Sequence, residues 1–138
     1  MKKLTIITIS FLLIFCSLLN SCSFKDDLAT FKKSKKSMES IIQKILSEEI
    51  EVDDKGVFLL PNESAFLSDT GEGYIVNYGY KEYGVYFFTF RGALGSSKGF
   101  LYKLSYEEYS SINRSSERFN FVSFEEIDER WFKVSTDD

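Results

Sequence analysis

After the N-terminal region, the chain carries one stripe of apolar residues spaced three and four positions apart, formed by Met38, Ile41, Ile42, Ile45 and Leu46. This spacing predicts an amphipathic helix, because it places the apolar residues on one helical face. Ser37 is a candidate N-cap. Leu28 and Phe31 extend the spacing backwards, so a start near Asp27 is the alternative. The polar cluster at residues 53–56 predicts the end of the helix.

From Gly56 onward, the apolar positions follow a period of two. Short aromatic and β-branched runs alternate with Gly-rich or polar breaks, which is typical of antiparallel strands joined by turns. The run at residues 85–91 is apolar on both faces, so we expect it at the centre of the sheet. The predicted fold class is α+β, with one N-terminal amphipathic helix packed on an antiparallel β meander of five or six strands. These strands are expected at residues 57–60, 74–78, 85–91, 100–104, 119–124 and 131–134.

The N-terminus has the features of an export signal. Met1 precedes two lysines, an uncharged and mostly apolar run covers residues 4–19, and small polar residues precede Cys22. The apolar run is shorter than the roughly 18 residues expected of a membrane-spanning helix. We therefore expect residues 1–21 to be a signal peptide.

The segment Leu19-Asn20-Ser21-Cys22 resembles the lipobox of bacterial lipoproteins. This resemblance, which covers residues 1–22 alone, implies that Cys22 carries a diacylglycerol on its thiol and a palmitate-like acyl chain on its amine. More than one acyl chain makes membrane anchoring stable. The resemblance further implies a place in the cell envelope, on the periplasmic side of a bacterial membrane, and Ser23 indicates the outer membrane if the organism is Gram-negative. Ordinary secretion is the alternative.

Charge divides the remaining chain into a basic tether and an acidic body. Asp and Glu number 21 against 17 Lys and Arg, for a net charge of −4. Residues 22–36 are predicted to be the lipidated tether, whose five lysines either lie along anionic headgroups or are solvated. Residues 37–138 are predicted to form a single globular domain, with ten basic and nineteen acidic residues.

The composition argues against several classes of function. Binding to duplex nucleic acid requires a surplus of Lys and Arg, which this chain lacks, so no nucleic acid is expected as a partner. There is no His, and Cys16 and Cys22 lie in or beside the signal, so the domain lacks the commonest base, zinc ligand and thiol nucleophile. We therefore expect no metal, no cofactor and no catalytic residue, and a protein that is not an enzyme.

Several motif-like segments are interpreted as turns or loops. Residues 92–99 have Ser97 where a phosphate-binding loop has its second glycine and Gly99 where it has Ser or Thr, and they precede a predicted strand, so no nucleotide is expected. Residues 53–54 and 69–73 lack the spacing of a calcium loop. The carboxylates at residues 125–129 are interpreted as a solvated loop between two strands, with a catalytic acid pair as the alternative.

The candidate partner-binding residues are Tyr80, Tyr83, Arg130 and Trp131. Tyr80 and Tyr83 lie in a segment polar enough to be a loop, and exposed tyrosines are enriched at interfaces. Their alternative role is packing at the end of a hairpin. The alternative for Trp131 is packing in the core.

Two functions compete on this evidence. The leading hypothesis is a membrane-anchored, non-enzymatic protein-binding module, such as an inhibitor, immunity factor or assembly accessory. The lipobox, the small domain and the tyrosine segment favour it, and the acidic body favours a basic partner. The rival hypothesis is a protein that binds or cleaves cell-wall glycan. That function requires exposed aromatic residues beside a groove and, for cleavage, two opposed carboxylates.

Overall fold

The computed structural model describes residues 27–91, 96–112 and 116–136. The chain divides into two units, Met1–Lys33 and Ser34–Asp138. The predicted signal peptide and Cys22 lie outside the described residues. No helix within the described residues is long and apolar enough to cross a membrane.

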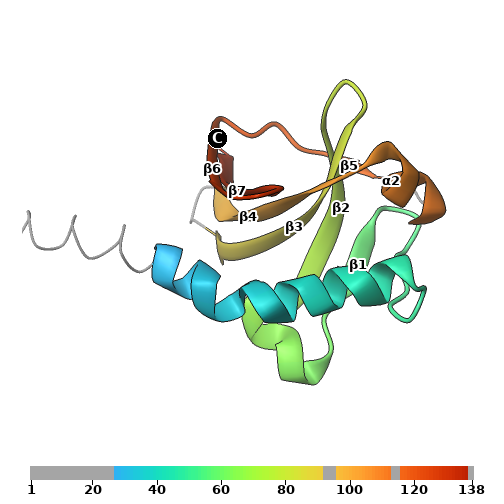
Figure 1. Ribbon diagram of the computed structural model, residues 1–138, viewed down its shortest axis with the longest axis horizontal. Helices are drawn as coiled ribbons and strands as arrows, with labels where there is room; N and C mark the ends of the chain where they lie inside the picture. The colour runs from blue at the N-terminus through green and yellow to red at the C-terminus, as the bar shows by residue number, and fades with distance from the viewer. Residues whose placement is uncertain (1–26, 92–95, 113–115, 137–138) are drawn as a thin grey trace, which may run out of the picture. The chain divides into compact units, whose positions relative to one another are not determined.

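The N-terminal amphipathic helix is confirmed. Residues 27–46 are helical, and the part from Ser34 onward runs across one face of the sheet (Figure 1). Ser37 lies inside this helix and is therefore not its N-cap. The predicted apolar stripe faces inward, because four of its side chains are at most 2% exposed, namely Met38, Ile41, Ile42 and Ile45.

The helix ends at residue 46, before the polar cluster at residues 53–56 that was predicted to end it. Glu48 adopts a left-handed conformation, with φ at 63°. The amide of Glu48 donates to the carbonyl of Ile45 at 3.1 Å, and the amide of Glu49 donates to the carbonyl of Lys44 at 2.8 Å. This pair of bonds is a Schellman motif, which satisfies carbonyls of the last helical turn.

Seven strands form one sheet within the described residues, so the protein belongs to the α+β class. They are β1 (Val57–Leu59), β2 (Glu72–Gly79), β3 (Glu82–Arg91), β4 (Ser97–Leu104), β5 (Glu117–Arg118), β6 (Ser123–Asp128) and β7 (Trp131–Thr136). Their order is β1-β2-β3-β4-β7-β6, and β5 pairs with β2. The predicted central strand, β3, lies between β2 and β4. The meander is limited to β1–β4, because β7 lies beside β4 and β5 runs parallel to β2.

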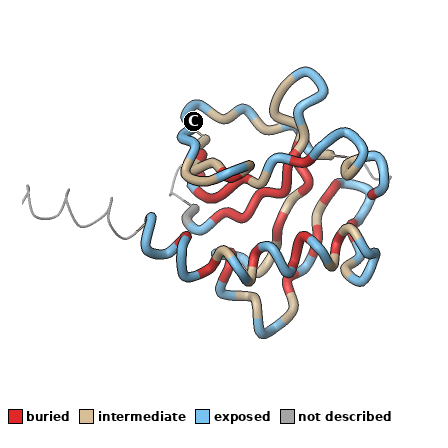
Figure 2. Tube along the Cα trace, viewed as in Figure 1, coloured by how far each residue is buried: buried red, intermediate tan, exposed pale blue. Residues whose placement is uncertain are grey.

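Both faces of the sheet are covered. Val85 and Phe87 point to the same face as Trp131, whose ring centroid lies 6.3 Å from that of Phe87. This is the face under the helix, because Lys35 bonds to Asp128, the neighbour of Trp131 in the β6–β7 pairing, at 2.7 Å. The opposite face carries a second aromatic core, comprising Val76, Tyr86, Phe88, Leu101 and Val134, covered by Phe119 and Phe121 among others. Figure 2 shows the buried positions along the helix and the central strands.

Two further elements correct the sequence predictions. The Ser-rich stretch at residues 105–116, which falls in the break between the predicted strands at 100–104 and 119–124, contains the helix α2 (Tyr106–Ile112). The predicted strand at residues 119–124 is replaced by β5 and β6, and β6 includes most of the acidic segment that was expected to be a loop. Residues 125–128 of this edge strand read Glu-Glu-Ile-Asp, which lacks the alternating hydrophobicity by which strands are predicted. A short 3₁₀ helix, η1 (Asn62–Leu67), connects β1 to β2.

Candidate functional site

The β2–β3 hairpin projects from the sheet beside a segment that is distant in sequence (Figure 1). The hairpin turns at Tyr80 and Lys81, and Lys81 has a left-handed φ of 56°. β5 pairs in parallel with Val76 and Asn77 near the end of β2. The amide of Phe119 also donates to the carbonyl of Asn77 at 3.0 Å. These bonds hold residues 116–120 alongside the hairpin.

Between the hairpin and residues 116–120 lies a cavity of about 510 Å³, which we name the hairpin groove. It is lined by Asn77, Tyr78, Gly79, Tyr80, Lys81, Tyr83, Ser116, Arg118 and Asn120. The lining therefore offers three phenol rings, two side-chain amides and two cations, and no carboxylate is among the described residues that line it. Rings supply flat apolar contact area, while amides and cations supply hydrogen bonds to polar or anionic groups.

Tyr80 and Tyr83 both line the hairpin groove, but they have different environments. Tyr80 is 89% exposed at the hairpin turn, with the Nζ atom of Lys81 5.5 Å from its ring centroid. Tyr83 is half-buried in β3 and stacks on Tyr109 of α2, with the ring centroids 3.6 Å apart. The segment predicted as a loop is thus a tight hairpin, with one exposed ring and one anchored ring.

Tyr78 forms the apolar side of the groove. Its ring lies 5.4 Å from the ring of Phe124 and 6.4 Å from that of Phe121, measured between centroids. Burial, assisted by the nearby carboxylate of Glu82, raises the pKa of Tyr78 to about 12. The phenol is therefore neutral at physiological pH and offers a hydroxyl group for hydrogen bonding.

Arg130 does not line the hairpin groove and is engaged in contacts within the fold. It lies at the β6–β7 turn, with its guanidinium carbon 4.5 Å from the ring centroid of Tyr102. Its Nη atoms donate to the carboxylate of Glu108, and its Nε atom donates to the carbonyl of Lys103 at 3.0 Å. Partial burial opposes ionisation of Glu108, but hydrogen bonds from Arg130 and Ser105 outweigh burial and lower the pKa of this carboxyl.

Trp131 also lies away from the hairpin groove. It is 1% exposed, and its ring centroid lies 5.1 Å from that of Tyr102. Its ring therefore packs in the core and presents no surface to a partner. The structure thus brings Tyr80 and Tyr83 together at one groove and leaves Arg130 and Trp131 outside it.

Arg118 and Asn120 are lining residues that sequence reasoning missed. They reach the groove because the two-residue strand β5 pairs in parallel with β2. A strand of two exposed residues has no periodicity, so the sequence offered no signal for this pairing.

No protein-family model matches the chain, and no curated protein or solved structure matches it either.

Proposed function

We propose that this protein is a lipoprotein anchored by Cys22 in the bacterial cell envelope, where it acts as a non-enzymatic protein-binding module. Its role would be that of an inhibitor, immunity factor or assembly accessory. The observation that carries the proposal is the hairpin groove, which presents the exposed ring of Tyr80 beside the anchored ring of Tyr83. The lipobox resemblance supports the envelope location.

The geometry of the hairpin suits recognition of a protein surface. Tyr83 is held by its stack on Tyr109, and β5 fixes the opposite side of the groove. A site that is ordered before binding loses less conformational entropy when the partner arrives. An exposed tyrosine at such a site adds a large contact area with few rotatable bonds. Lys81 and Arg118 make the lining locally basic, so the partner's contact surface is polar or acidic here.

Glycan binding is the second candidate function, and the side-chain composition of the same groove favours it. Tyrosine rings stack on sugar faces, and the amides of Asn77 and Asn120 match sugar hydroxyls. Glycan cleavage requires an acid pair, and the described residues that line the groove include no carboxylate. The second candidate is therefore limited to binding.

Site-specific photocrosslinking in the native bacterium tests the proposal. A photoreactive phenylalanine analogue replaces Tyr80, and the matched control carries it at Tyr106, which is 65% exposed and lines no part of the groove. We expect a discrete protein adduct from position 80 that position 106 does not give. The Arg118→Glu variant should weaken this adduct, because it reverses the charge of the lining.

The glycan alternative is tested by adding soluble peptidoglycan fragments to the full chain in neutral detergent. Saturable binding that Tyr80→Ala abolishes, together with the absence of a protein adduct, would assign the groove to glycan. Identical adducts from positions 80 and 106 would show that the hairpin groove is not the partner-binding site.

A further inference from the structure

A second groove lies at the end of β2 opposite the hairpin. Its cavity is about 610 Å³. We name it the acidic groove, because four carboxylate residues line it together with apolar residues that include Ile50 and Leu59. The four are Glu49, Glu51, Asp53 and Glu72. It shares no lining residue with the hairpin groove.

Leu59 gives this groove an exposed apolar surface. In β1, Phe58 points inward and is 1% exposed, whereas Leu59 is 69% exposed. The orientation is fixed by close packing, since a Cβ atom on Gly73 would lie 2.2 Å from the Phe58 ring. Glycine at position 73 therefore allows Phe58 to seat against β2 and leaves Leu59 outward. A large apolar side chain on a short strand near the sheet edge is the kind of surface that a partner covers.

The carboxylates around Leu59 are not neutralised within the described part of the chain. No Lys or Arg lines the acidic groove, and none of its four carboxylates forms an ion pair with a described residue. Asp53 has a local role, because its Oδ1 atom accepts bonds from the amides of Lys55 and Val57, both at 2.8 Å. Glu72 accepts a hydrogen bond from the Tyr74 hydroxyl at 3.3 Å, but neither Glu72 nor Glu51 is paired with a described cation. Glu51 and Glu72 therefore set a negative potential.

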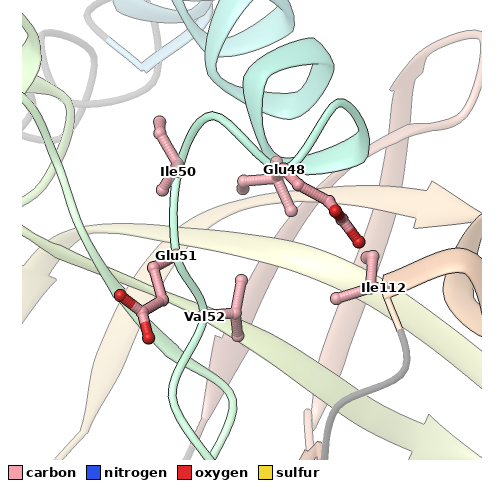
Figure 3. A pocket seen from close by; sticks show the side chains of 6 residues that line it. Glu48, Ile50, Glu51, Val52 and Ile112 are labelled. Atoms are coloured by element: carbon pink, nitrogen blue, oxygen red, sulfur yellow. The ribbon is translucent and has the colours of Figure 1, made fainter.

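The acidic and apolar character continues on the other side of residues 50–52. A smaller cavity of about 270 Å³ shares Ile50 and Glu51 with the acidic groove and reaches Ile112 of α2. Figure 3 shows Glu48 extending towards Ile112 and Glu51 extending to the other side of the backbone. A metal ion is not the suited occupant, because no group of three or more acidic, His or Cys side chains in the described residues is arranged to hold one.

We propose that the acidic groove docks a segment of a partner protein in which Lys or Arg residues flank apolar side chains. The apolar residues cover Leu59, and the cations face Glu51 and Glu72. This occupant is the one that matches both observations, an exposed apolar side chain and surrounding carboxylates without a described ion pair. The acidic groove thus has the opposite charge preference to the hairpin groove, where Lys81 and Arg118 are the charged lining residues.

The test uses the full chain in neutral-detergent micelles and two capped pentapeptides, Leu-Lys-Leu-Arg-Leu and its counterpart with glutamate at both charged positions. Backbone amide shifts are followed by NMR as each peptide is added. We expect saturable shifts at Leu59 and Glu72 with the basic peptide alone, and weaker binding as salt is raised.

Variants then separate the apolar and charged contributions. Leu59→Ser should weaken binding of the basic peptide about tenfold, because a buried leucine contact is lost. The double variant Glu51→Gln, Glu72→Gln should weaken it about fivefold, as expected for partly exposed ion pairs. Phe66→Ser is the matched control, since Phe66 is 66% exposed but does not line the groove, and it should bind like the parent. Circular dichroism checks that each variant is folded.

Three results would overturn the proposal. The first is equal binding of the two peptides, and the second is an equal effect of Leu59→Ser and Phe66→Ser. The third is a set of concentration-dependent shifts at Leu59 without peptide, which would assign the groove to a second copy of the chain. Because the two grooves share no residues, each of these outcomes leaves the test of the hairpin groove unaffected.

Discussion

The rings of Tyr83 and Tyr109 stack with centroids 3.6 Å apart and planes 5° from parallel. Tyr83 belongs to the hairpin and Tyr109 to α2, so this contact joins two elements that are separated by β4 along the chain. The same helix holds Arg130 through Glu108. α2 therefore connects the base of the hairpin groove with the β6–β7 turn.

This contact predicts opposite behaviour for the two tyrosines of the hairpin groove. Tyr83→Ala should lower the free energy of unfolding by about 1–2 kcal/mol, because it removes an aromatic pair and buried surface. Tyr80→Ala should leave stability nearly unchanged, because its ring is 89% exposed. Urea unfolding measures both. A double-mutant cycle on Tyr83 and Tyr109 should give a coupling of about 0.5–1.5 kcal/mol, and no coupling would show that the stack does not stabilise the fold.

The ion pair of Glu108 and Arg130 predicts a pH dependence of stability. The pKa of Glu108 is lower in the folded protein than its ordinary value of 4.5. Its stabilisation is therefore fully present well above pH 4.5 and is lost as the pH falls through the lower folded value. Glu108→Gln should cost about 0.5–1 kcal/mol at neutral pH, because both partners are partly exposed, and much less under acid conditions.

The control for this prediction separates the charge of Glu108 from its role at the helix start. The amide of Ser105 donates to Oε2 of Glu108 at 2.7 Å, and the Ser105 hydroxyl accepts from the amide of Glu108 at 3.2 Å. Gln preserves this capping box, whereas Ala removes it. Glu108→Ala should therefore remain destabilised in acid. A difference in the free energy of unfolding between the parent and Glu108→Gln that stays constant from about pH 7 to about pH 3 would contradict the ion-pair account.

The helix stripe could be predicted because its burial follows a regular period. The central position of β3 could be predicted because both faces of this strand are apolar. α2 also had a local signal, the Ser105-x-x-Glu108 capping box, but the surrounding Ser and Glu residues obscured it. The hairpin groove could be predicted only in part. Tyr80 and Tyr83 were visible as aromatic residues in a polar segment, whereas Arg118 depends on a long-range parallel pairing that no local pattern encodes.

Charge illustrates the same limit. The excess of acidic residues predicted a basic partner, but the net charge of a chain does not say where its charged residues lie in the fold. In the fold, Lys81 and Arg118 gather at one end of β2, while Glu51 and Glu72 gather at the other. The expected basic partner is therefore a proposal for the acidic groove alone.

Truncation of the helix stripe should destabilise the domain strongly. Ile42 is 1% exposed, so Ile42→Ala should lower the free energy of unfolding by about 2–5 kcal/mol through lost burial and a residual cavity. Its neighbour Gln43 is exposed on the same turn, so Gln43→Ala should change stability by less than about 0.5 kcal/mol. Urea midpoints for the two variants give the comparison. Equal midpoints would mean that the stripe is not packed in the core of the folded domain.

The lipid anchor is tested at its attachment residue. If Cys22 carries the acyl chains, Cys22→Ala should abolish incorporation of a labelled fatty acid and release the protein from the membrane fraction. Each buried methylene group contributes about 0.8 kcal/mol, so the loss of several acyl chains removes nearly all the membrane affinity. Cys16→Ala is the matched control, because Cys16 lies within the predicted signal peptide and should leave labelling and membrane association as in the parent. Fatty-acid label on the Cys22→Ala protein would show that the lipobox assignment is wrong.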